Sequence, residues 1–255
     1  LIVSLTIREA LAGSTGTDSV TDGTIESLSA DTNTSGSTVD WTFTSGSSGD
    51  SAFEFLAQGE TLELTYTLSL QDDSGDTASR TTTTTVTVTI TGTNDQPLVS
   101  SDTSNLFSGS VTELPDASTG ELTTSLTSNG SFSVNDLDLT DSLSVVVSSS
   151  PADALGTLNA SITDDNTADG LASISWEYSV NDSSVDSLAQ GEQRIETFTL
   201  TIADGQGGSS SNTVTITVTG SNDGPTAVAD TGSTSENLTL SVNAANGLLS
   251  NDTDP

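Results

Sequence analysis

The sequence predicts an all-β protein built from tandem Greek-key β-sandwiches joined end to end. Three observations lead to this fold class. Many short runs alternate apolar residues with Thr or Ser, clusters of Gly, Ser, Asn and Asp separate the runs, and the whole pattern occurs twice. Residues 61–70, TLELTYTLSL, have a leucine or tyrosine at every second position, as a strand with one buried face requires. Several such strands per unit are typical of a β-sandwich.

The strands are expected where this alternation is clearest, and Thr-rich runs favour strands because β-branched residues suit them. Trp41 and Trp176 have aliphatic neighbours in phase with them, which favours core packing over the alternative, a platform for stacking a sugar. The segment AQGEQRIETF carries the one helical hint, and its alternation favours a strand. The candidate strands are residues 1–7, 39–44, 61–70, 81–91, 143–148, 171–180, 194–203 and 212–220.

An internal repeat orders the chain. TVDWTFTS returns as SISWEYSV, LAQGE at 56–60 returns unchanged at 188–192, and TGTNDQP at 91–97 returns as TGSNDGP at 219–225. The offsets are similar, 95 to 223 (128) for the Asp of the last motif and 41 to 176 (135) for the Trp. The repeat predicts three units: 1–95, truncated at its N-terminus; 96–223, complete; and 224–255, the start of a third. The opening LIVSL resembles mid-domain strand, so we expect a piece of a longer protein.

The amino-acid composition excludes several classes of function. With 36 acidic and 3 basic residues, the net charge of −33 opposes binding to nucleic acid or anionic membrane. No apolar run is long enough to insert into a bilayer. The chain has no Cys, which excludes disulfides, and no His, which with Cys is the usual zinc ligand. Low hydrophobicity with high charge also raises the alternative of disorder, which the regular alternation opposes.

No catalytic site is expected. No His is present to activate a serine, and Arg8, Arg80 and Arg194 form no cluster in the sequence. Paired carboxylates could hydrolyse a glycoside, but the acidic clusters all fall at turns or joints.

The motifs resemble a known family. The order W-x-Y/F, L-x-x-GE, alternating strand, DGQGG, TVTITVTG and SNDGP resembles the VCBS repeats of giant type I-secreted, RTX-type bacterial adhesins. The chain is also similar to a distant cadherin: the NDxP joint resembles the interdomain linker, ADGQGG its A-x-D-x-G loop and NDLDLTD its D-x-D loop. The linker has only N-D where cadherins have a longer acidic run. The resemblance implies Ig-like, cadherin-like domains, calcium, and a secreted cell-surface protein of adhesion and biofilm formation.

The residues themselves also favour Ca²⁺ at the joints. Asn and Asp beside a Pro offer oxygen ligands on a stiffened backbone, and Ca²⁺ takes about 6 to 8 oxygens. The sequence leaves open whether Asp141 is a metal ligand or a solvated acidic residue in a turn. The residue spacing of an EF-hand loop is absent. Asp72 is expected to serve a preceding domain. The expected first-joint ligands are Glu60, Asn94, Asp95, Asp136, Asp138 and Asp204, and the second-joint ligands are Glu113, Glu192, Asn222, Asp223, Asp252 and Asp254.

The sequence therefore predicts non-catalytic extender repeats of an adhesin, stiffened by calcium at each joint. Their partners are neighbouring repeats of the same chain, with a host or matrix surface contacted through other domains of the parent. Two alternatives stay open. One is a sandwich that binds a glycan or protein, because fold alone does not decide function. The other is a subunit of a surface layer or extracellular filament.

Overall fold

The computed structural model describes residues 2–7, 43, 53–71, 81–102, 104, 106–166 and 169–254. Within these ranges the chain is all-β, with two single-turn 3-10 helices, Asp182–Ser184 and Ala244–Asn246. The expected strand at 39–44, with Trp41, falls outside the described residues apart from Phe43, and Asp72 lies outside them too. The strands are β1 Ile2–Ile7, β2 Thr61–Gln71, β3 Thr81–Thr91, β4 Leu98–Val99, β5 Ser108–Thr112, β6 Ser125–Asn135, β7 Ser144–Ser149, β8 Thr157–Asp164, β9 Leu171–Asn181, β10 Gln193–Ala203 and β11 Ser209–Thr219.

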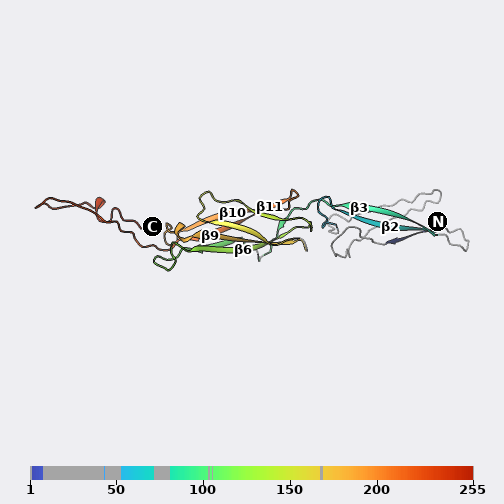
Figure 1. Ribbon diagram of the computed structural model, residues 1–255, viewed down its shortest axis with the longest axis horizontal. Coiled ribbons are helices and arrows are strands. Elements are labelled where there is room, and N and C mark those ends of the chain that lie inside the picture. The colour runs from blue at the N-terminus through green and yellow to red at the C-terminus, as the bar shows by residue number, and fades with distance from the viewer. Residues whose placement is uncertain are drawn as a thin grey trace.

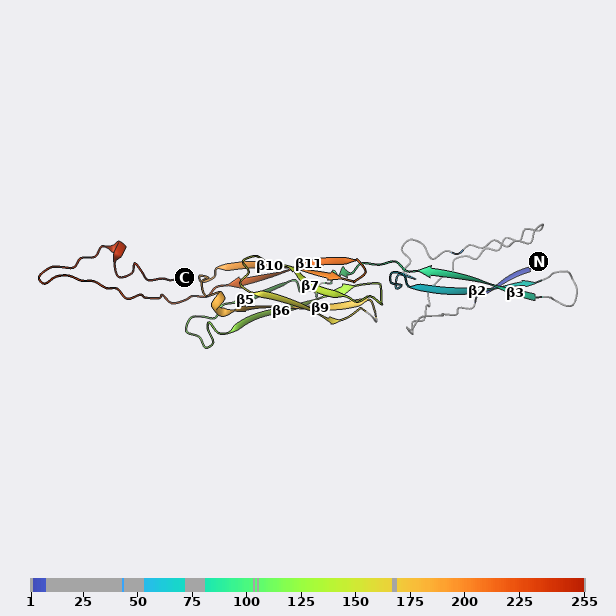
Figure 2. The ribbon, with the colours of Figure 1, turned by 45° about the horizontal axis from the view of Figure 1, so that its top comes forward.

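These strands form three sheets arranged along one long axis (Figure 1). The first sheet has the order β1-β2-β3. The other two, β5-β11-β10-β7 and β4-β6-β9-β8, form a sandwich, which Figure 2 shows as two stacked layers. Beyond β11 the chain extends away from the sandwich, and residues 226–254 contain no named strand.

The first sheet repeats part of the sandwich, as the sequence repeat requires. Both β1–β2 and β7–β10 are antiparallel, with Ile2 opposite Gln71 in one and Ser144 opposite Ala203 in the other. Gln71 and Ala203 are 132 positions apart (203 minus 71), the same offset that separates the two LAQGE motifs. The sheet β1-β2-β3 therefore has the pairing of β7-β10-β11, which supports the alignment made from sequence.

The core of the sandwich comes from the apolar face of each alternating strand. Phe132, Ile174, Phe198 and Val214 are buried, and the residues between them on the same strands are mostly Ser and Thr facing outward. Trp176 is 2% exposed and its Nε1–H donates to the carbonyl of Leu106 at 2.8 Å. Trp176 is thus a core residue, and it offers no surface on which a sugar could stack.

One charged residue belongs to this core. Glu196 is 1% exposed, and its carboxylate accepts hydrogen bonds from the Tyr178 hydroxyl at 2.8 Å and the Leu155 N–H at 2.5 Å. Arg194 Nε lies 4.0 Å from the same carboxylate and Arg194 also binds Asp153. Glu196 therefore ties both sheets to the crossing segment between β7 and β8, and its charge is paired, as a buried charge must be.

The glycine that ends each repeat is required by a close backbone approach. Gly220 follows β11 and packs on the LAQGE turn, donating to the Glu192 carbonyl at 2.9 Å and accepting from Gly191 at 3.0 Å. A Cβ at Gly220 would lie 2.4 Å from the Leu188 carbonyl oxygen. Gly92 makes the equivalent bonds to Glu60 and Gly59 in the first repeat. The TG pair thus joins the last strand of each repeat to its turn.

Gly220→Ala is expected to destabilise the sandwich, because the new methyl group meets backbone atoms that cannot move aside independently. Overpacking of this kind costs about 1–3 kcal/mol. Urea unfolding followed by tryptophan fluorescence measures the loss. Ser209→Ala, an exposed change on the same strand, is the matched control and should stay within about 0.5 kcal/mol of the parent. Equal stability of the two variants would contradict the role assigned to Gly220.

Candidate metal centre

The linker between the first sheet and the sandwich, residues 92–97, is held by acidic loops of the sandwich. The Asp95 N–H donates to Asp138 Oδ2 at 2.7 Å, and Asn94 Nδ2 donates to Asp204 Oδ2 at 3.0 Å. Pro97 is buried and β4 follows directly. The structure thus places the NDxP motif beside the D-x-D loop and the A-D-G loop of the sandwich.

Two loops of the sandwich present the carboxylates. Asp136, Asp138 and Asp141 lie between β6 and β7, where the Asp138 N–H donates to Asp136 Oδ1 at 3.2 Å and the Asp141 N–H donates to the Asp138 carbonyl at 3.1 Å. Asp204 directly follows β10, and its Oδ1 accepts from Gln206 at 2.7 Å and from Gly208 at 3.0 Å. These local hydrogen bonds hold the carboxylates of Asp136 and Asp204, while Asp136 Oδ2 and Asp141 Oδ2 have no hydrogen-bond partner.

Asp136, Asp141 and Asp204 form a cluster that we call the linker cluster. One carboxylate oxygen from each lies within 4.8 Å of the others, and all three residues are buried. Buried oxygens without a hydrogen-bond partner face this region: Asp136 Oδ2, Asp138 Oδ1, Asp141 Oδ2, Asn94 Oδ1 and Asn166 Oδ1. A buried anionic oxygen with no donor is costly, so the cluster fits a cation that supplies the missing partner.

The pKa shifts of these carboxylates also favour a bound cation. Burial, together with the charges of neighbouring carboxylates, raises the pKa of Asp136 and of Asp138 to about 6. Burial also raises the pKa of Asp141, with contributions from Asp204 and Glu60. For Asp204, burial is outweighed by hydrogen bonds from Asn94, Gln206 and Gly208, which hold its pKa below the ordinary value. In the described ranges the sole basic residue is Arg194, and it binds Asp153 rather than this cluster.

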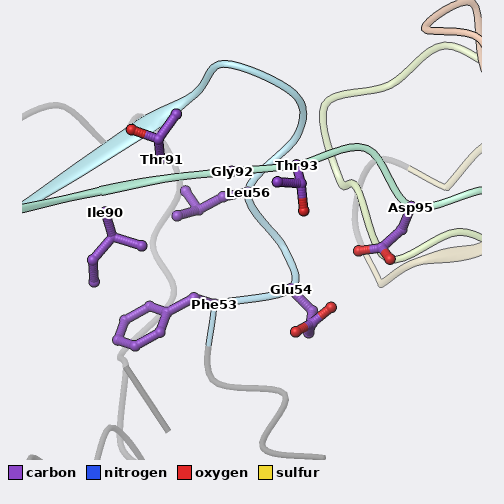
Figure 3. Close-up of a pocket in the computed structure, with 8 residues that line it drawn as sticks. All are labelled: Phe53, Glu54, Leu56, Ile90, Thr91, Gly92, Thr93 and Asp95. Atoms are coloured by element: carbon purple, nitrogen blue, oxygen red, sulfur yellow. The ribbon is translucent and has the colours of Figure 1, made fainter. Parts of the chain in front are cut away.

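The first sheet contributes to the same region through Glu60. Its Oε1 accepts from the Thr140 hydroxyl at 3.0 Å, across the linker, while its Oε2 accepts from the Ala57 N–H at 3.1 Å. Glu54 and Asp95 line one cavity beside the linker, and Figure 3 shows both side chains on the same side of Gly92 and Thr93. Carboxylates from both sides of the linker therefore converge on it.

The donor set suits a hard cation. Carboxylate, amide and carbonyl oxygens are the ligands that Ca²⁺ prefers, in number and with the flexibility that loops provide. Asp136, Asp141 and Asp204 would form the centre of the site, and Asp138, Asp95, Asn94 and Asn166 offer the further oxygens. A cation held there would neutralise the repulsion between these carboxylates.

A second cluster lies at the opposite end of the sandwich, and we call it the far cluster. Glu113, Asp186 and Asp223 each place a carboxylate oxygen within 4.8 Å of the others. Glu113 is 3% exposed, its Oε2 accepts from the Ser221 N–H at 2.7 Å, and its Oε1 has no partner. Burial and nearby Asp charges raise the pKa of both Glu113 and Asp223. Glu113 and Asp223 were expected ligands, and the structure brings them together.

The other expected residues at this end lie differently. Glu192 is exposed, and its Oε2 accepts from the Ala189 N–H at 3.1 Å, which makes it a turn residue like its repeat partner Glu60. Asn222 Nδ2 donates to the Asp223 carbonyl at 3.0 Å. Asp252 accepts from the Val228 N–H at 2.7 Å, and Asp254 contributes weakly to the raised pKa of Asp223. None of these four is among the three carboxylates that form the far cluster.

Sequence reasoning missed Glu54, Asn166 and Asp186, and left Asp141 open. A signal for two of them was present. Glu54 and Asp186 both stand two residues before the Leu of the LAQGE motif, 132 positions apart (186 minus 54), so aligning the repeats finds them together. Asn166 has no such signal, because its position beside Asp138 arises from the fold: its Nδ2 donates to the Asp138 carbonyl at 3.0 Å.

Comparisons with known proteins give structural resemblance alone. No family model matches the sequence, and no curated protein matches it. Similar solved structures include zebrafish RET cadherin-like domains 1 to 4 (12% identity, TM-score 0.31), CfaE, the adhesive subunit of CFA/I fimbria of enterotoxigenic Escherichia coli (14%, 0.36), and mouse clustered PcdhgC3 EC1-3 (16%, 0.32). The alignments cover 65%, 66% and 66% of this chain but 34%, 59% and 45% of those chains. This chain thus spans less than two thirds of each.

A search of the described residues for a membrane-spanning helix, one both long and apolar enough, returns none.

The raised pKa values predict that the metal-free protein becomes more stable on mild acidification. Asp136 and Asp138 have pKa values of about 6 in the folded state and an ordinary value of 3.8, so the folded state binds more protons between those limits. Stability therefore rises as pH falls from 7 to about 5. Asp204, with a lowered pKa, acts in the opposite direction, but below its ordinary value of 3.8.

Thermal unfolding in chelator at a series of pH values measures this effect. The double variant Asp136→Asn, Asp138→Asn should show a smaller rise, because two of the protonating groups are gone, while Asp141, Glu113 and Asp223 still contribute. A melting temperature that falls steadily from pH 7 to 5 in the parent would contradict the electrostatics described here.

Proposed function

We propose that this chain is a non-catalytic extender region of a secreted bacterial surface adhesin, in which calcium bound at the joints stiffens successive β-sandwiches into a rod. The observation that carries the proposal is that Asp136, Asp138 and Asp141 each have a buried carboxylate oxygen without a hydrogen-bond partner. These residues lie beside the linker, whose Asp95 N–H is bonded to Asp138. Residues 1–95, 96–223 and 224–255 are the successive units. The role serves cell adhesion or biofilm formation.

Charge repulsion and its relief are the mechanism. Without a cation, Glu60 on one side of the linker and Asp136, Asp141 and Asp204 on the other repel, and burial makes that repulsion stronger than it would be in water. A bound Ca²⁺ supplies the shared positive charge. Because Asp95 and Asn94 are part of the linker, holding them fixes the direction in which the linker leaves the sandwich. Calcium would then control both the stability of each sandwich and the distance that the tandem units span.

Two observations favour this role over ligand binding and catalysis. Trp176 is in the core, and the outward residues of β6 and β9 are mostly Ser, Thr and Asn, so these described faces offer no aromatic platform for a glycan. The sequence has no His, and the buried Glu196 is paired with Tyr178 and the backbone rather than free to act as an acid or base. The acidic clusters lie at the ends of the sandwich, where neighbours in a tandem array meet.

Calcium is expected to stabilise the full chain. A ligand that binds only the folded state at 100 times its Kd contributes about 2.7 kcal/mol, so the melting temperature should rise with added CaCl₂ and fall with chelator. Differential scanning calorimetry and isothermal titration measure the two effects. A melting temperature that is the same in calcium and in chelator would remove the metal from the proposal.

Matched variants separate loss of binding from misfolding. Asp136→Asn together with Asp141→Asn should abolish the calcium shift while leaving the metal-free protein folded, because each of these carboxylates has a buried oxygen without a donor and neutral amides relieve the repulsion. Glu177→Gln changes an exposed carboxylate on β9, far from both clusters in the fold, and should keep the full shift.

Stiffening is a separate expectation with its own measurement. The sequence has no Cys, so spin labels can be placed at Thr85→Cys on β3 and Ser131→Cys on β6, both exposed. Electron–electron double resonance should give a narrow distance distribution in calcium and a broad one in chelator. If the two distributions have the same width while calcium still raises the melting temperature, the ion stabilises the sandwich without setting the joint.

A further inference from the structure

The parallel pair formed by β5 and β11 has the geometry of a mechanical clamp. β5, Ser108–Thr112, lies beside the second half of β11 in parallel register, with Ser108 opposite Thr215 and Thr112 opposite Thr219. All the other strand pairs described in the chain are antiparallel. One parallel pair at the edge of an otherwise antiparallel sheet is a specific feature of this sandwich, and neither the metal clusters nor the repeat pattern requires it.

The two strands of this pair connect to opposite ends of the sandwich. The chain enters at Pro97 from the linker, next to the start of β11, where Gly208 lies against Asn94 and Gln96. It leaves after Thr219, at the far cluster, toward the C-terminal segment (Figure 2). Tension along the chain therefore pulls β5 toward its own N-terminal end and β11 toward its own C-terminal end.

Because the strands are parallel, these pulls slide one strand along the other. The inter-strand hydrogen bonds then carry the load together, whereas strands pulled apart from one end break their bonds one after another. The hydrogen bonds to β11 continue beyond both ends of β5. The Thr215 N–H donates to the Phe107 carbonyl at 2.9 Å, and the Glu113 N–H donates to the Thr219 carbonyl at 3.0 Å. Both ends of the pair are thus secured by backbone bonds.

Side chains anchor β5 against sliding. Val111 is buried in the sandwich core, and Phe107 packs on Phe132 with ring centroids 5.2 Å apart. A Cβ on Gly109 would lie 3.0 Å from Trp176, so the strand sits close over the core tryptophan. Moving β5 along its axis would pull these groups out of their sites and expose apolar surface, in addition to breaking the ladder.

The segment before β5 is held more weakly. β4, Leu98–Val99, pairs with β6 over two residues, and the Ser100 and Leu106 N–H groups donate to β6 carbonyls at 2.9 Å each. Leu98 is 63% exposed, so it adds little packing. Under tension this short contact fails before the β5–β11 pair.

From this topology we propose that the β5–β11 pair is the element that resists tension in the sandwich, so that the module stays folded when its two ends are pulled apart. The biological use of such resistance rests on the proposed role as an adhesin extender. The mechanical property itself does not, because it follows from strand direction and the positions of the linkers.

Single-molecule force spectroscopy on the full chain tests it, with pulling points defined by introduced cysteines in a sequence that has none. Ser108→Cys with Thr219→Cys pulls the pair in shear. Thr112→Cys with Thr219→Cys pulls apart two residues that face each other at one end of the pair, and so peels it. The two variants share one attachment point, and Ser108 and Thr112 are both exposed.

The rupture force in shear should exceed the peeling force several-fold at the same loading rate, since forced unfolding reports the unfolding barrier. Equal forces in the two geometries would overturn the clamp. Repeating both in calcium and in chelator keeps the two proposals apart: a shear-to-peel difference that is the same in calcium and in chelator supports the clamp, whereas the metal role is decided by the melting temperature in the two conditions. Forces that respond to calcium but are equal in both geometries remove the clamp and leave the metal role standing.

Discussion

The constraint on which the rest of this structure depends is the confinement of like charges at the two ends of the sandwich. Asp136, Asp141 and Asp204 are buried together at one end, and Glu113 lies with Asp186 and Asp223 at the other. Burial and mutual repulsion raise the pKa of most of these groups, which means that the ionised state is unfavourable without a counter-charge. A fold that keeps such groups buried at neutral pH stores repulsion that a divalent cation would relieve.

Between its two acidic ends, the sandwich is held together by an apolar core and by bonds between strands. Its core is largely apolar, and the charge of the buried Glu196 is met by Tyr178, the Leu155 N–H and Arg194. Its described outer faces carry small hydroxyl side chains, some of which bond across strands, as Ser148 does to Thr201 at 2.8 Å. The strands therefore hold together through the core and these cross-strand bonds, and a cation bound at the end clusters would act on the joints and on stability rather than on the identity of the fold.

The sequence predicted the parts of this arrangement that repeat or alternate. Period-two runs located β2, β3, β9, β10 and β11 to within a few residues, and the repeat motifs brought Asn94 and Asp95 to the loops of Asp138 and Asp204, as the structure has them. The sequence did not predict β4, β5, β6 and β8. β4 has two residues and β5 has five, which is too short for a clear alternation, and the inward face of β6 includes Ser128 and Gly130 in place of large apolar residues. Glu192 was expected at the far end as the repeat counterpart of Glu60. Its Oε2 accepts from the Ala189 N–H, as Glu60 Oε2 does from the Ala57 N–H, and Glu192 is not among the three carboxylates of the far cluster. Asp186, which does lie there, depended on an alignment of residues just outside the motif.

The end clusters and the parallel strand pair act on the same path through the molecule. A linker free to swing would deliver tension at varying angles, and part of it would peel strands rather than shear them. Asp95 and Asn94 fix the entry of the chain next to the start of β11, and the Ser221 N–H bond to Glu113 fixes its exit at the end of that strand. Tension then runs along β11, the direction in which the β5–β11 ladder is strongest. An ion bound at the acidic ends would therefore also orient the load along the β5–β11 pair, so the end clusters and the strand topology would act together under tension.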